Sequence, residues 1–129
     1  MTSIAVFSES VVEQAALAWF EGNGYAVKSG PDIAFDGPLP ERAGFEDPLL
    51  PRRLRDALLR LNRHLPVEAV DDAIKRLLSP PGTSLVARNR ALHLMLVNGI
   101  DVEYRRDDGS IAGARVQVID FADPDENDW

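Results

Sequence analysis

The sequence contains no cysteine, and it lacks the features that would place it in a membrane or outside the cell. Without cysteine, disulfide bonds and thiolate catalysis are excluded, and the cytoplasm is the expected compartment. No apolar run approaches the roughly 18 residues that a membrane-spanning helix needs. The opening MTSIAVFSES has no basic region before an apolar stretch, so we expect no secretory signal.

Common nucleotide-binding and hydrolase motifs are also missing. The sequence has no G-x-x-x-x-G-K-[ST] loop, no G-x-G-x-x-G loop and no G-x-S-x-G elbow. His64 and His93 each lack a second histidine at the spacing of metal ligands. We therefore expect no cofactor-binding residue and no metal centre in this chain.

The dipeptide Pro31-Asp32 matches the first half of a motif found in many metal-dependent nucleases. In those enzymes a P-D is followed by D/E-x-K, and the two carboxylates hold Mg²⁺ beside the scissile phosphate. The chain has two lysines, Lys28 and Lys75, and alanine stands two residues before each of them. Because neither lysine completes the motif, we interpret Pro31-Asp32 as a turn dipeptide.

The sequence has 129 residues and is 45% hydrophobic, and both values suit one globular domain. Its net charge is −7. The charge is uneven. RRLRDALLRLNRH holds five arginines and one aspartate, whereas DFADPDENDW holds five acidic residues and no basic one. Arg53, Arg60 and Arg63 are candidates for contacts with a DNA phosphate backbone. The alternative is that they form the solvated face of an amphipathic helix.

Hydrophobic spacing predicts a mixed α/β (α+β) fold with four helices, a short strand and a C-terminal β-hairpin. The helices are expected at 11–21, 52–63, 66–78 and 85–97, the short strand at Tyr25–Val27, and the hairpin strands at 100–104 and 115–121. A proline-rich irregular loop is expected at 29–51. The expected core positions are Val12, Ala15, Ala16, Trp19, Phe20, Leu54, Leu58, Leu61, Leu65, Val70, Ala73, Ile74, Leu77 and Leu78.

Two glutamates, Glu9 and Glu13, lie four residues apart near the start of the first predicted helix. Like charges at this spacing repel by roughly 0.2–0.5 kcal/mol. Ser10 and Glu13 match the capping-box pattern S-x-x-E, with Ser10 as the N-cap. Each carboxylate also favours a helix N-terminus by roughly 0.3–1 kcal/mol, so helix-start electrostatics can account for both.

Four stretches span nearly all of the chain from Phe7 onward: SESVVEQAALAWFEGNGYAVKSGPDIAFDG, RLRDALLRLN, SLVARNRALHLMLVNGIDVEYR and RVQVIDFADPDEND. In this order they resemble the N-terminal segment of the R subunit of type I restriction endonucleases. No single motif among them is diagnostic, and the colinear set carries the resemblance.

The resemblance implies that residues 1–129 are the N-terminal part of a nuclease domain of the PD-(D/E)xK type. The catalytic Asp, the D/E-x-K and the helicase motor would follow in the parent subunit. That subunit would translocate DNA with ATP and cleave double-stranded DNA with Mg²⁺ in host defence, together with methylation and specificity subunits. In nucleases of this fold the first helix often carries a glutamate facing the metal site, and Glu13 best matches that position. We expect the chain alone to be inactive and to self-associate.

The second hypothesis is a stand-alone acidic module that binds another protein and has no catalytic activity. The acidic ending, the exposed hairpin edges and the lack of a self-contained active site favour it. Such a module would be monodisperse and unfold cooperatively, whereas a fragment would expose apolar surface and associate.

Overall fold

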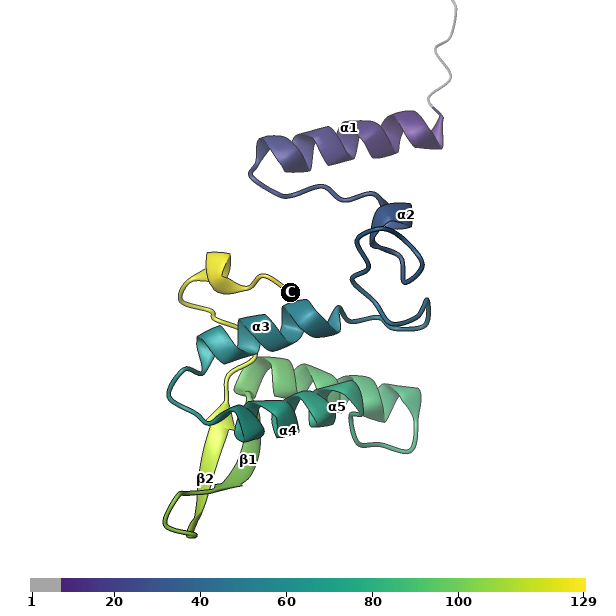
Figure 1. Cartoon of the computed structure of the whole chain (residues 1–129). Coiled ribbons are helices and arrows are strands. Elements are labelled where there is room, and N and C mark those ends of the chain that lie inside the picture. Colours follow the sequence, from purple (N-terminus) through teal and green to yellow (C-terminus); the bar gives the residue numbers. More distant parts are fainter. Residues whose placement is uncertain (1–7) are drawn as a thin grey trace, which may run out of the picture. The chain divides into compact units, whose positions relative to one another are not determined.

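The computed structural model describes residues 8–129, which divide into two compact units (Figure 1). Unit 1 extends to Pro40, and unit 2 runs from Glu41 to Trp129. The described residues form five α-helices, one short 3-10 helix and a two-stranded antiparallel sheet, which confirms the mixed α/β prediction. Every helix among them is too short or too polar to cross a membrane.

In unit 1, helix α1 spans Glu9–Gly22 and begins two residues before its predicted start. Its N-cap is Ser8, whose carbonyl accepts hydrogen bonds from the N–H groups of Val11 and Val12. Ser10 therefore lies inside the first turn, and the capping box of Ser10 with Glu13 is wrong. Ser8 and Ser10 are both possible N-caps from the sequence. The S-x-x-E spacing favoured Ser10, whereas the extended backbone of an N-cap is found at Ser8.

The apolar residues of α1 are exposed, contrary to the prediction of a buried stripe. Val12 is 58% exposed and Trp19 is 67% exposed, and no residue of α1 is buried. Residues 25–27, predicted as a strand, have no strand partner among the described residues and form none. The predicted loop contains one short helix, α2 (Gly30–Ile33), which includes Pro31-Asp32.

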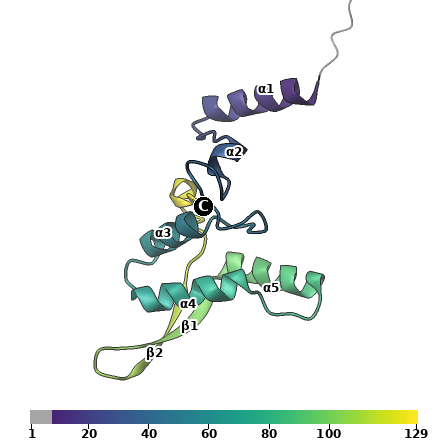
Figure 2. The same ribbon diagram turned by 45° about the vertical axis from the view of Figure 1, so that its right-hand side comes forward.

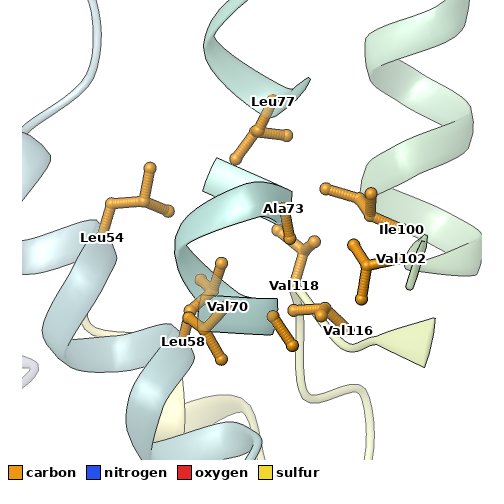
Figure 3. Packing of buried hydrophobic residues seen from close by; sticks show 10 residues of the cluster. Leu54, Leu58, Val70, Ala73, Leu77, Ile100, Val102, Val116 and Val118 are labelled. Carbon is orange, nitrogen blue, oxygen red and sulfur yellow. The ribbon is translucent and has the colours of Figure 1, made fainter. Parts of the chain in front are cut away.

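Unit 2 is built around α4 (Val67–Leu78), which packs against both α3 (Pro51–Leu61) and the β-hairpin (Figures 1 and 2). Figure 3 shows the apolar side chains of these elements meeting in one cluster. Its fully buried members are Leu54, Leu58, Ala69, Val70, Ala73, Leu77, Ile100, Val102, Val116 and Val118. Most of the predicted α3 and α4 core positions are therefore confirmed, whereas Leu78 is 52% exposed.

The hairpin pairs β1 (Ile100–Arg105) with β2 (Ile111–Val116), and Ile100 lies opposite Val116. The predicted C-terminal β-hairpin is confirmed, but the predicted bounds of its second strand, 115–121, are wrong, because pairing begins at Ile111 and ends at Val116. The ladder ends at Val116 because β1 begins only at Ile100, so no strand residue lies opposite Gln117. The side chain of Asn62 instead binds both the backbone N–H and the carbonyl of Gln117.

The turn of the hairpin fixes which backbone groups point outward. The N–H of Arg106 donates to the Ser110 carbonyl at 2.7 Å, and bonded pairs alternate along an antiparallel ladder. The outward-pointing groups therefore belong to Asp101, Glu103 and Arg105 in β1 and to Ile111, Gly113 and Arg115 in β2. Arg76 of α4 binds one of them, donating to the Asp101 carbonyl at 3.0 Å.

Helix α5 spans Leu85–Asn98 and ends within one residue of its prediction. At its start, the Ser84 hydroxyl accepts a hydrogen bond from the N–H of Ala87 at 3.1 Å, as expected for an N-cap. Gly99 ends the helix with a φ of +80°. A Cβ at Gly99 would lie 2.8 Å from the carbonyl oxygen of Val116, so both the conformation and the space there require glycine.

Candidate functional site

Arg53 and Arg60 lie on the same side of α3, because their spacing of seven residues is almost two helical turns. The chain after β2 returns to this helix and ends beside it (Figures 1 and 2). We call residues 120–128 of this returning chain the acidic segment. Arg53 and Arg60 are the α3 arginines that contact it.

The guanidinium of Arg53 is bound by carboxylates from two directions. Its Nε and one terminal nitrogen donate to the two oxygens of Glu41, at 3.0 and 2.8 Å. The other terminal nitrogen donates to Asp128 at 3.3 Å. The hydrogen bonds to Glu41, more than the charge of Asp128, raise the pKa of Arg53. Arg53 thus ties the loop before α3 and the acidic segment to the helix.

The remaining α3 arginines have different surroundings. Arg60 donates to the backbone carbonyl of Glu126 at 3.4 Å. Arg55 points to α4 and pairs with Asp71 at 2.9 Å, and these hydrogen bonds raise its pKa. Arg63 lies beyond the end of α3 and is exposed, with no side-chain hydrogen bond or ion pair to other described residues. Two of the three candidate DNA contacts, Arg53 and Arg60, therefore lie in α3.

The acidic segment has a defined conformation of its own. The side-chain amide of Asn127 accepts from the N–H of Asp120 and donates to its carbonyl, both at 2.8 Å. The carboxylate of Asp120 accepts from the N–H groups of Ala122 and Asp123. Beyond the segment, the indole of Trp129 donates to the carbonyl of Val118 at 3.2 Å. These bonds lie within the returning chain and do not involve the arginines.

Asn62 fixes the start of this returning chain. Its side chain is buried, with 1% of the residue exposed. The amide nitrogen donates to the carbonyls of Leu58 and Gln117, and the amide oxygen accepts from the Gln117 N–H, all at 2.8 Å. Asn62 was not among the residues predicted from the sequence to have a role. The sequence pattern that could have indicated its role is its spacing. Asn62 is a polar residue four positions after Leu58 and eight after Leu54, so it falls on the buried side of the helix.

Glu13, the candidate catalytic residue, lies in the second turn of α1 and is exposed. It belongs to unit 1, whereas the candidate arginines belong to unit 2. Among residues 8–129, no three histidine, aspartate or glutamate side chains are grouped so that they could hold a metal ion. The described residues alone therefore do not fit a complete Mg²⁺ site, and no catalytic step can be derived through one.

The comparisons with known proteins identify the chain. A family model described as the type I restriction enzyme R protein N terminus matches residues 6–129. The chain belongs to this family. It is also 28% identical over 116 residues to the type I restriction enzyme HindI endonuclease subunit of Haemophilus influenzae. That match covers 90% of this chain and 11% of the Haemophilus subunit. No solved structure shows a significant match.

The resemblance seen in the sequence is thus confirmed: this is the N-terminal region of a type I restriction enzyme R subunit. Within this R-subunit region, the best-defined polar arrangement is the one around Arg53, where three parts of unit 2 meet.

Proposed function

We propose that this R-subunit region forms the front of a nuclease domain of the PD-(D/E)xK type. The subunit that contains it cleaves double-stranded DNA with Mg²⁺ after ATP-dependent translocation, in a complex with methylation and specificity subunits. The observation that carries the proposal is the family match over residues 6–129. The endonuclease name of the Haemophilus relative supports the reaction class.

Within this proposal, Glu13 lies near the catalytic metal of the intact subunit, and the α3 arginines contact the DNA backbone. A guanidinium suits the second role because its planar set of donors matches the oxygens of a phosphate. Residues 1–129 by themselves are expected to cleave no DNA when Mg²⁺ and ATP are supplied. Reproducible cleavage by the purified chain would contradict this expectation.

The role of Glu13 is tested in the assembled enzyme. The Glu13→Gln substitution in the complete subunit is expected to slow cleavage of plasmid DNA by about 10- to 100-fold, as for residues that support a metal site. ATP hydrolysis should remain unchanged, since the motor is a separate part of the proposed subunit.

Glu9→Gln provides the matched control. Glu9 lies one helical turn earlier in α1, and its substitution makes the same change of charge. It is expected to leave cleavage at the level of the unmodified enzyme. Equal cleavage by the Glu13 and Glu9 variants would remove Glu13 from the proposed site.

A further inference from the structure

Carboxylate and carbonyl oxygens from the acidic segment occupy the two arginines that α3 presents on one side. Asp128 accepts from Arg53 at 3.3 Å, and the Glu126 carbonyl accepts from Arg60 at 3.4 Å. An arginine binds carboxylate and phosphate with the same planar set of donors. The oxygens of the segment therefore stand where phosphate oxygens would have to bind.

We propose that the acidic segment masks a polyanion-binding surface on α3. DNA binds Arg53 and Arg60 only after displacing the segment, so the segment acts as an internal competitor for the DNA backbone. The identity of the polyanion as DNA rests on the proposed function. The masking contact itself rests on the bonds of Arg53 and Arg60.

The exposure of the paired side chains indicates which contact can be exchanged. The carboxylate of Asp128 is 68% exposed, whereas that of Glu41 is 17% exposed. Ion pairs between exposed groups are weak and screened by salt, so phosphate can replace Asp128 more readily than Glu41. Arg53 would then keep Glu41 on one edge and offer the other edge to DNA.

Two carboxylates of the segment can be removed without breaking the bonds that shape it. Asp120 and Asp123 accept backbone hydrogen bonds inside the segment, so they are left unchanged. Asp125 is exposed, and the hydrogen-bond partner of the Asp128 carboxylate is Arg53. The informative variant is therefore Asp125→Asn/Asp128→Asn.

A matched control makes the same change of charge far from α3 in the sequence. Glu103→Gln/Asp107→Asn alters two exposed residues of the hairpin, one in β1 and one in its turn. Both double variants raise the net charge from −7 to −5, since each removes two carboxylates. Any difference in DNA affinity between the two variants is therefore due to where the carboxylates were removed and not to the total charge.

The test is equilibrium binding of a short fluorescent DNA duplex to residues 1–129 across a salt series. The segment variant is expected to bind roughly two- to fivefold more tightly than the control, the range for loss of an exposed ion pair. Its plot of log affinity against log salt should be steeper by about 0.9, for one added phosphate contact. Adding Arg53→Gln should remove both differences.

Equal binding by the two double variants, or no binding by the segment variant, would overturn the masking proposal. Thermal unfolding of each variant verifies that it is folded, and a segment variant that lost its fold is replaced by Asp128→Asn alone. Cleavage by the assembled enzyme judges the proposed function separately. If the assembled enzyme cleaves DNA but the two double variants bind DNA equally, only the masking proposal is rejected. If the double variants differ in DNA binding but the assembled enzyme does not cleave, only the nuclease proposal is rejected.

Discussion

Asn62 and Asn127 use their side-chain amides in the same way, although they lie in different parts of unit 2. Each amide binds the N–H and the carbonyl of one backbone residue, Gln117 for Asn62 and Asp120 for Asn127. The contact reproduces the pair of hydrogen bonds that a neighbouring strand would make. Together the two asparagines hold the path of the chain after β2.

The Asn62→Ala substitution is expected to destabilise the protein by about 1–3 kcal/mol, because it leaves the backbone N–H and the carbonyl of Gln117 without their side-chain partner. Denaturant unfolding followed by circular dichroism measures the change. Asn98→Ala is the control, since Asn98 is exposed at the end of α5, and it should stay within about 0.5 kcal/mol. Equal losses would show that the bonds of Asn62 add little.

Residue-level roles were the hardest to predict from the sequence. The prediction for Arg53 and Arg60 was a choice between phosphate contact and a solvated face. The structure shows a third state, in which both contact other parts of the same chain. The partners Glu41 and Asp128 lie far from Arg53 in the sequence, so helix periodicity carries no information about them.

At the level of elements, the helices of unit 2 were predicted well because their apolar positions repeat with the period of a helix. Leu54 and Leu58 in α3, and Val70, Ala73 and Leu77 in α4, are buried as expected. The same periodicity in α1 predicted burial that the structure does not show. A hydrophobic stripe indicates that a helix can be covered, but it does not specify the partner.

The bounds of β2 were missed for a related reason. Hydrophobic alternation continues past Val116, and Val118 is buried as a strand residue would be. Alternation reports which side chains face the core, whereas strand pairing depends on the neighbour of the backbone. Because β1 begins only at Ile100, directly after α5 and Gly99, no strand residue lies opposite Gln117, and the alternating pattern continues past the end of the sheet.

The joint between α5 and β1 gives a prediction at the level of elements. Gly99→Ala is expected to destabilise the protein by about 1–3 kcal/mol, because the φ of +80° and the nearby Val116 carbonyl both disfavour a Cβ. Gly113→Ala is the comparison, since a Cβ there meets no atom within 4 Å. Melting temperatures of the two variants measure the difference, and a larger loss for the Gly113 variant would contradict the assignment.

At the level of the whole molecule, the two units differ in how they are stabilised. Every buried residue of the hydrophobic cluster belongs to unit 2, between Leu54 and Val118. Unit 1 contributes no buried residue through α1 or α2. A single 14-residue helix is marginal in water, so unit 2 carries the measurable folding stability.

A chain of residues 41–129 is therefore expected to unfold cooperatively, with a midpoint within a few degrees of that of residues 1–129. Scanning calorimetry of both chains tests this. A chain of residues 8–40 serves as the complement and should show little helix by circular dichroism. Loss of cooperative unfolding in residues 41–129 would show that unit 2 depends on unit 1.

Family membership was the property that the sequence predicted best, because it rests on colinear stretches and not on contacts. The resemblance to the R-subunit N-terminus is confirmed over nearly the whole chain. The metal-proximal role of Glu13 stays a prediction. It depends on the spatial arrangement of a catalytic centre, which the spacing of residues in this chain does not encode.

Arg76 and Asn62 have a joint consequence for how the sheet can grow. Arg76 holds the outward carbonyl of Asp101 on one edge, and Asn62 holds both backbone groups of Gln117 on the other. Each side chain binds backbone groups at the end of the hairpin farthest from its turn, where those groups can no longer pair with another strand. A third strand would therefore find outward backbone groups available only between these contacts and the turn, so the two side chains limit how much of each edge it could pair with.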